Sequence, residues 1–244
     1  MQVDQFRYGA DNLAYVLSSD FKAIAIDPGA VGDILTCLDE KALELVAVAN
    51  THSHPDHVSG TQDLLTATGA TFLDNRSLRQ KEIIKLGKEV IQVYHTPGHT
   101  HDSLCFYTPP YTDEALDYTA PGFLISGDTL FNGTIGNCFS GDLKAYYRSI
   151  KSLMVLPKDT IIYAGHDYVR DSIQFARSIE PGNPYLDAYL KKYDHTHVCS
   201  TLEDEMKVNP YLRFNAPDMV KLMESKGLST QTEWERWDAI MHLG

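Results

Sequence analysis

The sequence THSHPDH at residues 51–57 places three histidines and one aspartate within six consecutive residues. An apolar run of β-favouring residues, 45–50, precedes it and predicts a buried strand that ends where this segment begins. Pro55 and Gly60 then predict a turn, with a helix beginning near His57. The segment is therefore expected to be a loop at the end of a core strand, where a rigid scaffold presents polar side chains to a site.

The spacing within this loop favours metal binding. Residues two apart share a face of an extended chain, so His52 and His54 can bind one ion. Asp56 and His57 follow the proline bend and can be turned toward a second ion. Imidazole and carboxylate groups suit zinc, iron and manganese. A dense cluster of this kind predicts a metal site rather than an ordinary surface.

The same arrangement of an apolar strand, small turn residues and then a histidine or aspartate recurs three times along the chain. It is found at His99, Asp128 and His166. An α/β scaffold assembles a site from distant parts of a sequence by placing polar residues at the ends of several strands. We therefore expect these residues to meet the 51–57 loop.

Composition limits the class of protein. The chain has 244 residues, 43% hydrophobic and 22% charged, which is ordinary for a soluble globular protein. The net charge of −12 argues against nucleic-acid binding, which needs a basic face. We expect no membrane association, since no apolar run reaches about 18 residues. The N-terminus lacks a signal-peptide pattern and the four cysteines form no CxxC pair, so a cytoplasmic protein with reduced thiols is expected.

Strands and helices alternate irregularly in the first two thirds of the chain. Strand-like runs cover 3–8, 13–17, 22–26, 45–50, 70–73, 89–95, 104–108, 122–126 and 160–164, and helical spacing covers 31–43, 58–68 and 142–156. Residues 109–121 are expected to form an exposed excursion. Beyond about residue 170 only helix candidates appear, at 171–179, 185–193, 216–226 and 232–243. This order favours an α/β fold of two packed sheets with outer helices, followed by a small helical region.

On these motifs the sequence resembles the metallo-β-lactamase superfamily. The matching segments are THSHPDH at 51–57, TPGHT at 96–100, SGDTLF at 126–131 and AGHDY at 164–168, with Asp27 in AIDPG as a fifth element. Within the superfamily the chain is similar to glyoxalase II, the hydroxyacylglutathione hydrolases, through FARSIEPGNP at 175–184 and STLEDEMKVNPYLRF at 200–214. The resemblance implies an αββα sandwich of two mixed sheets over residues 1–169. It also implies an α-helical domain over 170–244 that contributes to substrate binding.

The resemblance also implies two divalent metal ions per chain, zinc with iron or manganese as further candidates. The implied ligands are His52, His54 and His99 for the first ion and Asp56, His57 and His166 for the second, with Asp128 bridging both. Asp27 matches an aspartate that accepts a hydrogen bond from a ligand, and a turn-forming aspartate before proline is its alternative. Other polar residues are expected not to bind metal: His95, His101 and Asp102 near His99, and His195, His197 and His242 on the surface of the helical tail.

The implied reaction is hydrolysis of S-(2-hydroxyacyl)glutathione, such as S-lactoylglutathione, in the glyoxalase route of methylglyoxal detoxification. A hydroxide bridging the two ions would attack the thioester carbonyl, and the first ion would stabilise the oxyanion. Asp128 would set the separation of the ions, and Asp56 would also orient the water. Both carboxylates are therefore candidate catalytic residues.

The substrate-binding positions match the family less closely. Tyr168 matches a substrate tyrosine and Arg213 a carboxylate-binding arginine, with core packing and an ion pair as their respective alternatives. Asn137 and Phe139 stand where the family has a lysine and a tyrosine, and Ala216 replaces a further expected lysine. A lost charged hydrogen bond costs about 1.5–3 kcal/mol, so either glutathione binds more weakly or the carrier thiol differs.

The sequence is less consistent with three other functions. A mononuclear iron persulfide dioxygenase of the same superfamily would need only part of the ligand set. A non-catalytic binding module would not require intact ligands in four loops, and many true β-lactamases place a cysteine where this chain has Asp56. We expect a monomer that acts on a small-molecule thioester.

Overall fold

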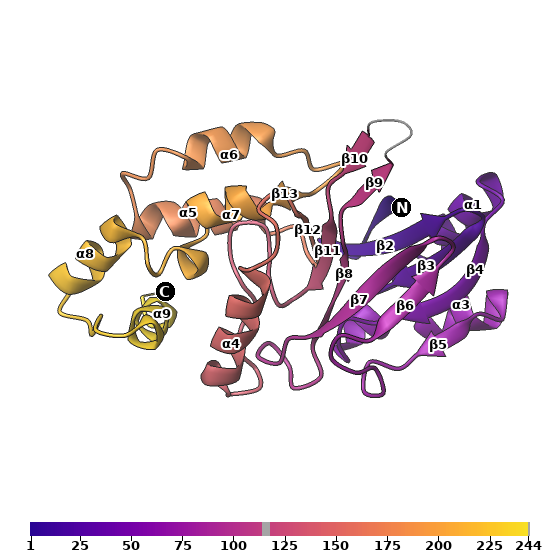
Figure 1. Ribbon diagram of the computed structural model, residues 1–244, viewed down its shortest axis with the longest axis horizontal. Helices are drawn as coiled ribbons and strands as arrows, with labels where there is room; N and C mark the ends of the chain where they lie inside the picture. The colour runs from indigo at the N-terminus through magenta and orange to yellow at the C-terminus, as the bar shows by residue number, and fades with distance from the viewer. Residues whose placement is uncertain (114–117, 244) are drawn as a thin grey trace.

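Two mixed β-sheets packed face to face form the centre of the molecule in this computed structural model, which describes residues 1–113 and 118–243 (Figure 1). The first sheet has the order β1-β2-β3-β4-β5, with bounds Gln2–Tyr8, Asn12–Ser19, Lys22–Ile26, Glu44–Ala49 and Thr71–Leu73. The second has the order β13-β12-β11-β8-β7-β6, with bounds Ser200–Thr201, Ile161–Ala164, Phe123–Gly127, Leu104–Thr108, Glu89–His95 and Ile83–Leu86. Strands β3, β4 and β5 run parallel, as do β11 and β12.

The core between the sheets follows from the two-residue period of the strands. In β2 every residue is buried, with Tyr15 and Leu17 facing the second sheet and Ala14 and Val16 facing the outer helices. The inner layer is completed by residues such as Phe106 of β8. A sheet buried on both faces explains why these strands appear in the sequence as continuous apolar runs.

Helices cover both outer faces. Helices α1 (Val31–Glu40) and α3 (Thr61–Thr68) lie on the first sheet, where Ile34 and Leu64 are fully buried. Helix α4 (Leu143–Leu153) covers the second sheet through Tyr146 and Ile150. The expected αββα sandwich is confirmed. No helix in residues 1–113 or 118–243 is long and apolar enough to cross a membrane.

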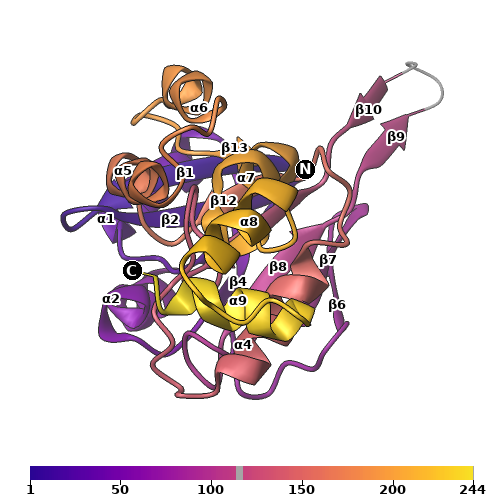
Figure 2. The ribbon, with the colours of Figure 1, turned by 90° about the vertical axis from the view of Figure 1, so that its left-hand side faces the viewer.

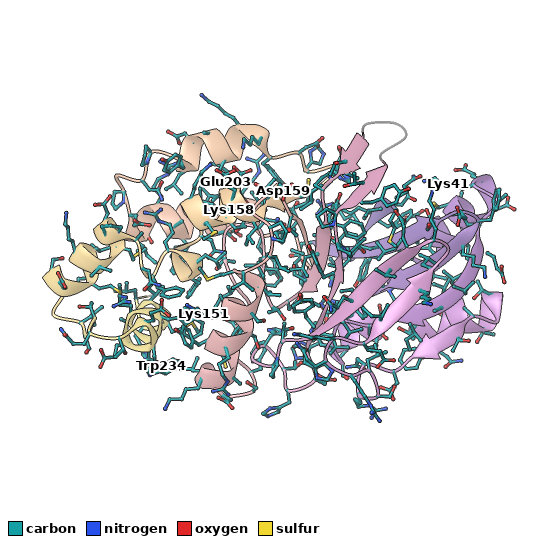
Figure 3. All side chains as sticks on the ribbon, viewed as in Figure 1. Lys41, Lys151, Lys158, Asp159, Glu203 and Trp234 are labelled. Carbon is teal, nitrogen blue, oxygen red and sulfur yellow. The ribbon has the colours of Figure 1, made fainter. Side chains whose placement is uncertain are left out.

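The C-terminal helices are α5 (Val169–Ile179), α6 (Leu186–Lys192), α7 (Leu202–Val208), the 3-10 turn η1 (Pro210–Leu212), α8 (Pro217–Ser225) and α9 (Glu233–Met241). Helices α8 and α9 pack on the outer face of the second sheet, in front of it in Figure 2, whereas α5 and α6 contribute residues to the core between the sheets. Trp237 of α9 is buried against Tyr146 and Tyr147 of α4. Beside it Lys151 donates to Glu233 at 2.7 Å, at the place labelled Lys151 in Figure 3.

Some elements differ from the sequence-based expectation. The helix expected over 58–68 is two helices, α2 (Pro55–Val58) and α3, separated at Gly60. A Cβ on Gly60 would lie 2.0 Å from the carbonyl oxygen of Pro28, so this close contact requires glycine. The excursion at 109–121 contains a hairpin of β9 (Tyr111–Asp113) and β10 (Tyr118–Ala120), and its tip at 114–117 lies outside the described residues.

The helical tail contributes β13 and α7, two elements without a clear sequence signal. Strand β13 is only two residues long, and it pairs with β12. Helix α7 begins at Thr201, whose side chain accepts a hydrogen bond from the Asp204 amide. A polar residue pattern dominates this short helix, so an apolar period does not reveal it.

A buried carboxylate joins this tail to the second sheet. Glu205 of α7 is fully buried and accepts four hydrogen bonds. The donors are the Gly133 amide (2.8 Å), the Ser200 hydroxyl (2.7 Å), the Asn209 amide group (3.1 Å) and the Tyr189 hydroxyl (2.5 Å). Burial raises the pKa of Glu205, and the hydrogen bonds from these groups offset part of that rise. All acceptor positions are therefore satisfied, and the tail is anchored at Gly133.

Replacing Glu205 with glutamine is expected to destabilise the fold, because an amide NH₂ group would face donors instead of accepting from them. The expected loss in the free energy of unfolding is about 1–3 kcal/mol, measured by denaturant titration. Glu203→Gln, an exposed change on the same helix, is the control. A Glu205→Gln protein as stable as the control would show that this network does not anchor the tail.

Candidate metal centre

Metal-competent side chains meet at one edge of the sandwich, where several strands end. His52 and His54 follow β4, and His99 follows β7. Asp128 follows β11 and His166 follows β12. The parallel pairings of β3 with β4 and of β11 with β12 bring these ends to the same edge. The fold therefore collects residues that lie more than 100 positions apart in the sequence.

The first group consists of His52, His54, His99 and Asp128, each offering one ligand atom within 4.8 Å of the others. His99 Nε2 lies 3.1 Å from His54 Nδ1. His52 Nε2 is buried and has no hydrogen-bond partner among the described residues. A buried nitrogen in this position is one that a cation can satisfy.

The second group consists of Asp56, His57 and His166, again within 4.8 Å of one another. His57 Nε2 lies 3.2 Å from His166 Nε2, and Asp56 Oδ2 lies 3.3 Å from His166 Nε2. The Asp56 side chain is 44% exposed, whereas that of His57 is fully buried. This group is thus open to solvent on the Asp56 side.

Asp128 lies between the two groups. Its Oδ1 is 3.2 Å from His57 Nε2, while Oδ2 is 3.4 Å from His99 Nε2 and 3.5 Å from His166 Nε2. Gly165 makes room for it, because a Cβ there would lie 2.2 Å from Asp128 Oδ1. The glycine before His166 is therefore a steric requirement of the site.

The charges of these groups suit a cation. Burial lowers the pKa of His52 to about 3 and also lowers that of His99, so both imidazoles are neutral. Burial opposes the charged form of His57 too, but Asp27 and Asp128 raise its pKa to about 11. Burial raises the pKa of Asp128, yet the adjacent His166 and His57 rings hold it well below its ordinary value. Positive charge at His57 Nε2 is thus favoured by the surrounding carboxylates, and a bound cation would supply it.

The donor set also fits the chemistry of the implied ions. Neutral imidazole nitrogens and ionised carboxylate oxygens are ligands for zinc, iron and manganese. Two of the buried atoms without a hydrogen-bond partner in the described residues, His52 Nε2 and Asp128 Oδ1, belong to these groups. The residues present therefore fit divalent metal ions.

Asp27 connects both ends of the 51–57 loop. It is buried, with a positive φ of 52°, and it accepts from the Thr51 amide (2.7 Å) and the Thr51 hydroxyl (2.7 Å). Its Oδ2 also lies 2.9 Å from His57 Nδ1. This contact leaves Nε2 of His57 as the ring nitrogen that faces the cluster.

Three further supporting contacts were not predicted from the sequence. Asp11 Oδ1 lies 2.8 Å from His166 Nδ1, and Asn12 Nδ2 donates to Asp56 Oδ2 at 2.8 Å. The Asn137 carbonyl accepts a hydrogen bond of 2.9 Å from His99 Nδ1. A single polar residue at the start of a strand forms no pattern that a sequence can reveal. A contact through a backbone carbonyl does not depend on the residue type, so the sequence cannot indicate it either.

Asp102 links the two loops that carry the first group. Its Oδ1 accepts from the Thr100 hydroxyl at 2.7 Å, and its Oδ2 accepts from Asn75 Nδ2 at 2.7 Å and from the Ser53 hydroxyl. Ser53 lies between His52 and His54 in the sequence. Asp102 belongs to neither group of metal-competent residues, but its hydrogen bonds tie together the loops that carry them.

The structure places some of the expected substrate-binding residues beside the metal centre and another away from it. Tyr168 stacks on His166 with ring centroids 4.9 Å apart, and Phe139, 66% exposed, places its ring edge-on to His99 at 5.3 Å. Arg213 does not join them. Its guanidinium makes a bidentate ion pair with Glu180, at 2.7 and 2.9 Å, which corresponds to the ion-pair alternative.

The remaining histidines lie outside the two groups. His95 Nε2 lies 2.7 Å from the Leu78 carbonyl. Four others are exposed: His101, His195, His197 and His242. None of these five belongs to the two groups of metal-competent side chains found among the described residues.

Removing Asp27 is expected to weaken metal binding without touching a ligand. Asp27→Ala frees the His57 ring and the Thr51 hydroxyl, and loss of such a supporting contact typically lowers metal affinity about 10–100-fold. Competition with a chromophoric zinc chelator measures this change. Asp33→Ala, an exposed change on α1, is the control, and an affinity equal to that of the control would show that Asp27 does not orient the ligand.

Comparisons with known proteins agree with this geometry. The family model described as "Metallo-beta-lactamase superfamily" matches residues 8–73 and 70–166, and "Hydroxyacylglutathione hydrolase C-terminus" matches 167–242. Two proteins named hydroxyacylglutathione hydrolase are each 30% identical to the chain. The one from Chromohalobacter salexigens aligns with 89% of this chain and 88% of its own length, and the one from Pseudoalteromonas translucida with 100% and 97%.

A solved structure shows the same fold. The crystal structure of ETHE1 from Myxococcus xanthus superposes with a TM-score of 0.69 at 24% identity, covering 100% of this chain and 91% of that one. At this identity the likeness concerns the fold alone. The sequence matches go further, because they extend through both the metal centre and the helical tail. The chain therefore belongs to the hydroxyacylglutathione hydrolase family of the metallo-β-lactamase superfamily.

Proposed function

We propose that the protein is a binuclear metal-dependent thioester hydrolase that cleaves S-(2-hydroxyacyl)glutathione, such as S-lactoylglutathione, to glutathione and a 2-hydroxy acid. The observation that carries this proposal is the position of Asp128, whose carboxylate lies within 3.5 Å of histidines from both groups of ligand side chains. The names of the related proteins support the same reaction.

Seven side chains would hold the two ions. His52, His54 and His99 would bind the first, Asp56, His57 and His166 the second, and Asp128 both. When bound, divalent ions of this kind supply Lewis acidity toward a carbonyl oxygen and lower the pKa of water toward about 7. Zinc, iron and manganese all suit the ligands.

The protein's own residues then orient the reactants. Burial opposes ionisation of Asp56, but the hydrogen bond from Asn12 and the nearby His57 lower its pKa, so it is a carboxylate at neutral pH. Because it is the exposed member of the cluster, Asp56 can accept a hydrogen bond from an incoming water and orient it toward the thioester. Water adds to the acyl carbon as the carbon–sulfur bond breaks, and the thiolate leaves and takes up a proton.

Aromatic side chains border the metal centre on two sides. Tyr168 and Phe131 pack around His166, and the exposed Phe139 ring lies edge-on to His54 and His99. Such rings limit the access of bulk water and offer apolar surface to the acyl group and the sulfur. Asn137 and Tyr168 are the polar side chains proposed to contact substrate here.

The second ligand group argues against the mononuclear dioxygenase. That chemistry needs one ion, whereas Asp56, His57 and His166 converge here as closely as the first group does. A purely binding role would leave the supporting contacts from Asp11, Asn12 and Asp27 without purpose. Hydrolysis uses both groups.

Loss of the shared carboxylate is expected to abolish turnover. Asp128→Asn keeps the shape of the side chain but removes its charge, and several kcal/mol of transition-state stabilisation correspond to a loss on the order of 1000-fold in kcat. Hydrolysis of S-lactoylglutathione by zinc-loaded protein measures it. Asp63→Asn, an exposed change on α3, is the control, and a variant within tenfold of that control would contradict the proposal.

Metal counting is expected to separate one ion from two. Wild-type protein loaded with zinc and desalted should hold about two ions per chain by elemental analysis, and His166→Ala about one, because only the second group loses a ligand. His195→Ala is a matched control on an exposed histidine. One ion in wild-type protein, unchanged in His166→Ala, would instead support a mononuclear centre.

A further inference from the structure

A pocket adjoins the metal centre on the side of α5. Its volume is about 300 Å³, and its walls come from the loop after β11 and the start of α5. Tyr168, which stacks on His166, lies on one side, and Asn137, whose carbonyl accepts from His99, lies on the other. A thioester whose carbonyl reaches the metal centre would extend its thiol portion into this pocket.

The described residues in the walls of this pocket include no lysine or arginine. Among the described residues that line it, Asp171 is the only charged one, and most of the others are aromatic, aliphatic or small. The first turn of α5 would attract an anion, but Asp171 lies in that turn and already complements the helix end. The pocket is therefore neutral to acidic.

Three cations of the neighbouring elements are engaged elsewhere. Arg213 pairs with Glu180 and lines a different cavity beside Pro181. Lys151 of α4, labelled in Figure 3, donates to Glu233 of α9, and Arg170 lies over the Tyr193 ring at 5.3 Å. None of these three lines the pocket.

From this geometry we propose that the pocket does not recognise the carboxylates of the carrier thiol, so that the enzyme hydrolyses 2-hydroxyacyl thioesters of uncharged thiols as well as those of glutathione. This inference rests on the proposed function. A glutathionyl group carries two carboxylates and one ammonium, and recognition of a carboxylate normally uses arginine or lysine. Ions at the metal centre act on the thioester carbonyl, which every carrier shares, and so do not select among thiols.

The test compares S-lactoylglutathione with S-lactoyl-N-acetylcysteamine, whose thiol portion is uncharged. Metal-loaded wild-type protein is expected to show kcat/KM values for the two within about tenfold. Asn137→Lys, which adds a cation to the pocket wall, is expected to raise the ratio in favour of glutathione about tenfold at low salt, in line with one charge-assisted hydrogen bond. Gln174→Lys adds the same charge on α5 outside the pocket lining and should leave the ratio unchanged.

A preference for the glutathione thioester above 100-fold in wild-type protein would overturn the inference. Binding of S-methylglutathione, measured by calorimetry, gives a readout without turnover. Millimolar affinity with little dependence on salt is expected, whereas micromolar affinity that weakens with salt would reveal a carboxylate clamp and overturn the inference. Absence of hydrolysis of both thioesters would reject the proposed function. The binding measurement would still decide whether the pocket recognises the carboxylates of glutathione.

Discussion

The structure depends on holding electron-rich groups against one another. Imidazole nitrogens of His54 and His99, and of His57 and His166, lie 3.1–3.2 Å apart around the buried Asp128 carboxylate. Without a shared proton or a cation these contacts are unfavourable, and a flexible chain would relax them. The strands of both sheets fix the loops that carry them, so the protein preorganises a site whose missing charge a metal supplies. The rigid sandwich is thus required to keep these side chains close together.

Carboxylates and a carbonyl behind the ligands complete this constraint. Asp27 acts on His57, Asp11 on His166 and the Asn137 carbonyl on His99, in each case through the ring nitrogen that faces away from the cluster. An imidazole has two nitrogens, and fixing one as a donor directs the lone pair of the other. The backbone at Asp27 has a positive φ, which costs energy for a residue other than glycine, and the three hydrogen bonds it accepts compensate for that cost. The turn at Asp27 therefore carries the local strain and also orients the His57 ring.

Much of this arrangement could be predicted from the sequence, and the exceptions have physical reasons. The candidate ligands follow apolar strands and have distinctive chemistry, so both their grouping and the layered fold could be inferred. The contact between Asp11 and His166 spans 155 residues and depends on strand order, which no local pattern encodes. The break at Gly60 depends on the approach of Pro28. Arg213 could be placed in the tail but not oriented, because the choice between a substrate and Glu180 is made by tertiary packing.

Side chains of the helical tail hold the loop that follows Asp128 through hydrogen bonds to its backbone groups, and no cation of the tail is needed for these contacts. Glu205 binds the Gly133 amide, and the Asn209 side chain donates to the Thr134 carbonyl, so α7 and η1 hold the loop that follows Asp128. That loop and α5 form the pocket walls, while the ligands come from the sandwich. Residues facing the pocket, such as Asn137, can therefore change without altering the ligand geometry, because the loop is fixed by contacts on its opposite side. This separation explains how a chain can keep every candidate metal ligand of its family and yet lose the cations expected to bind glutathione.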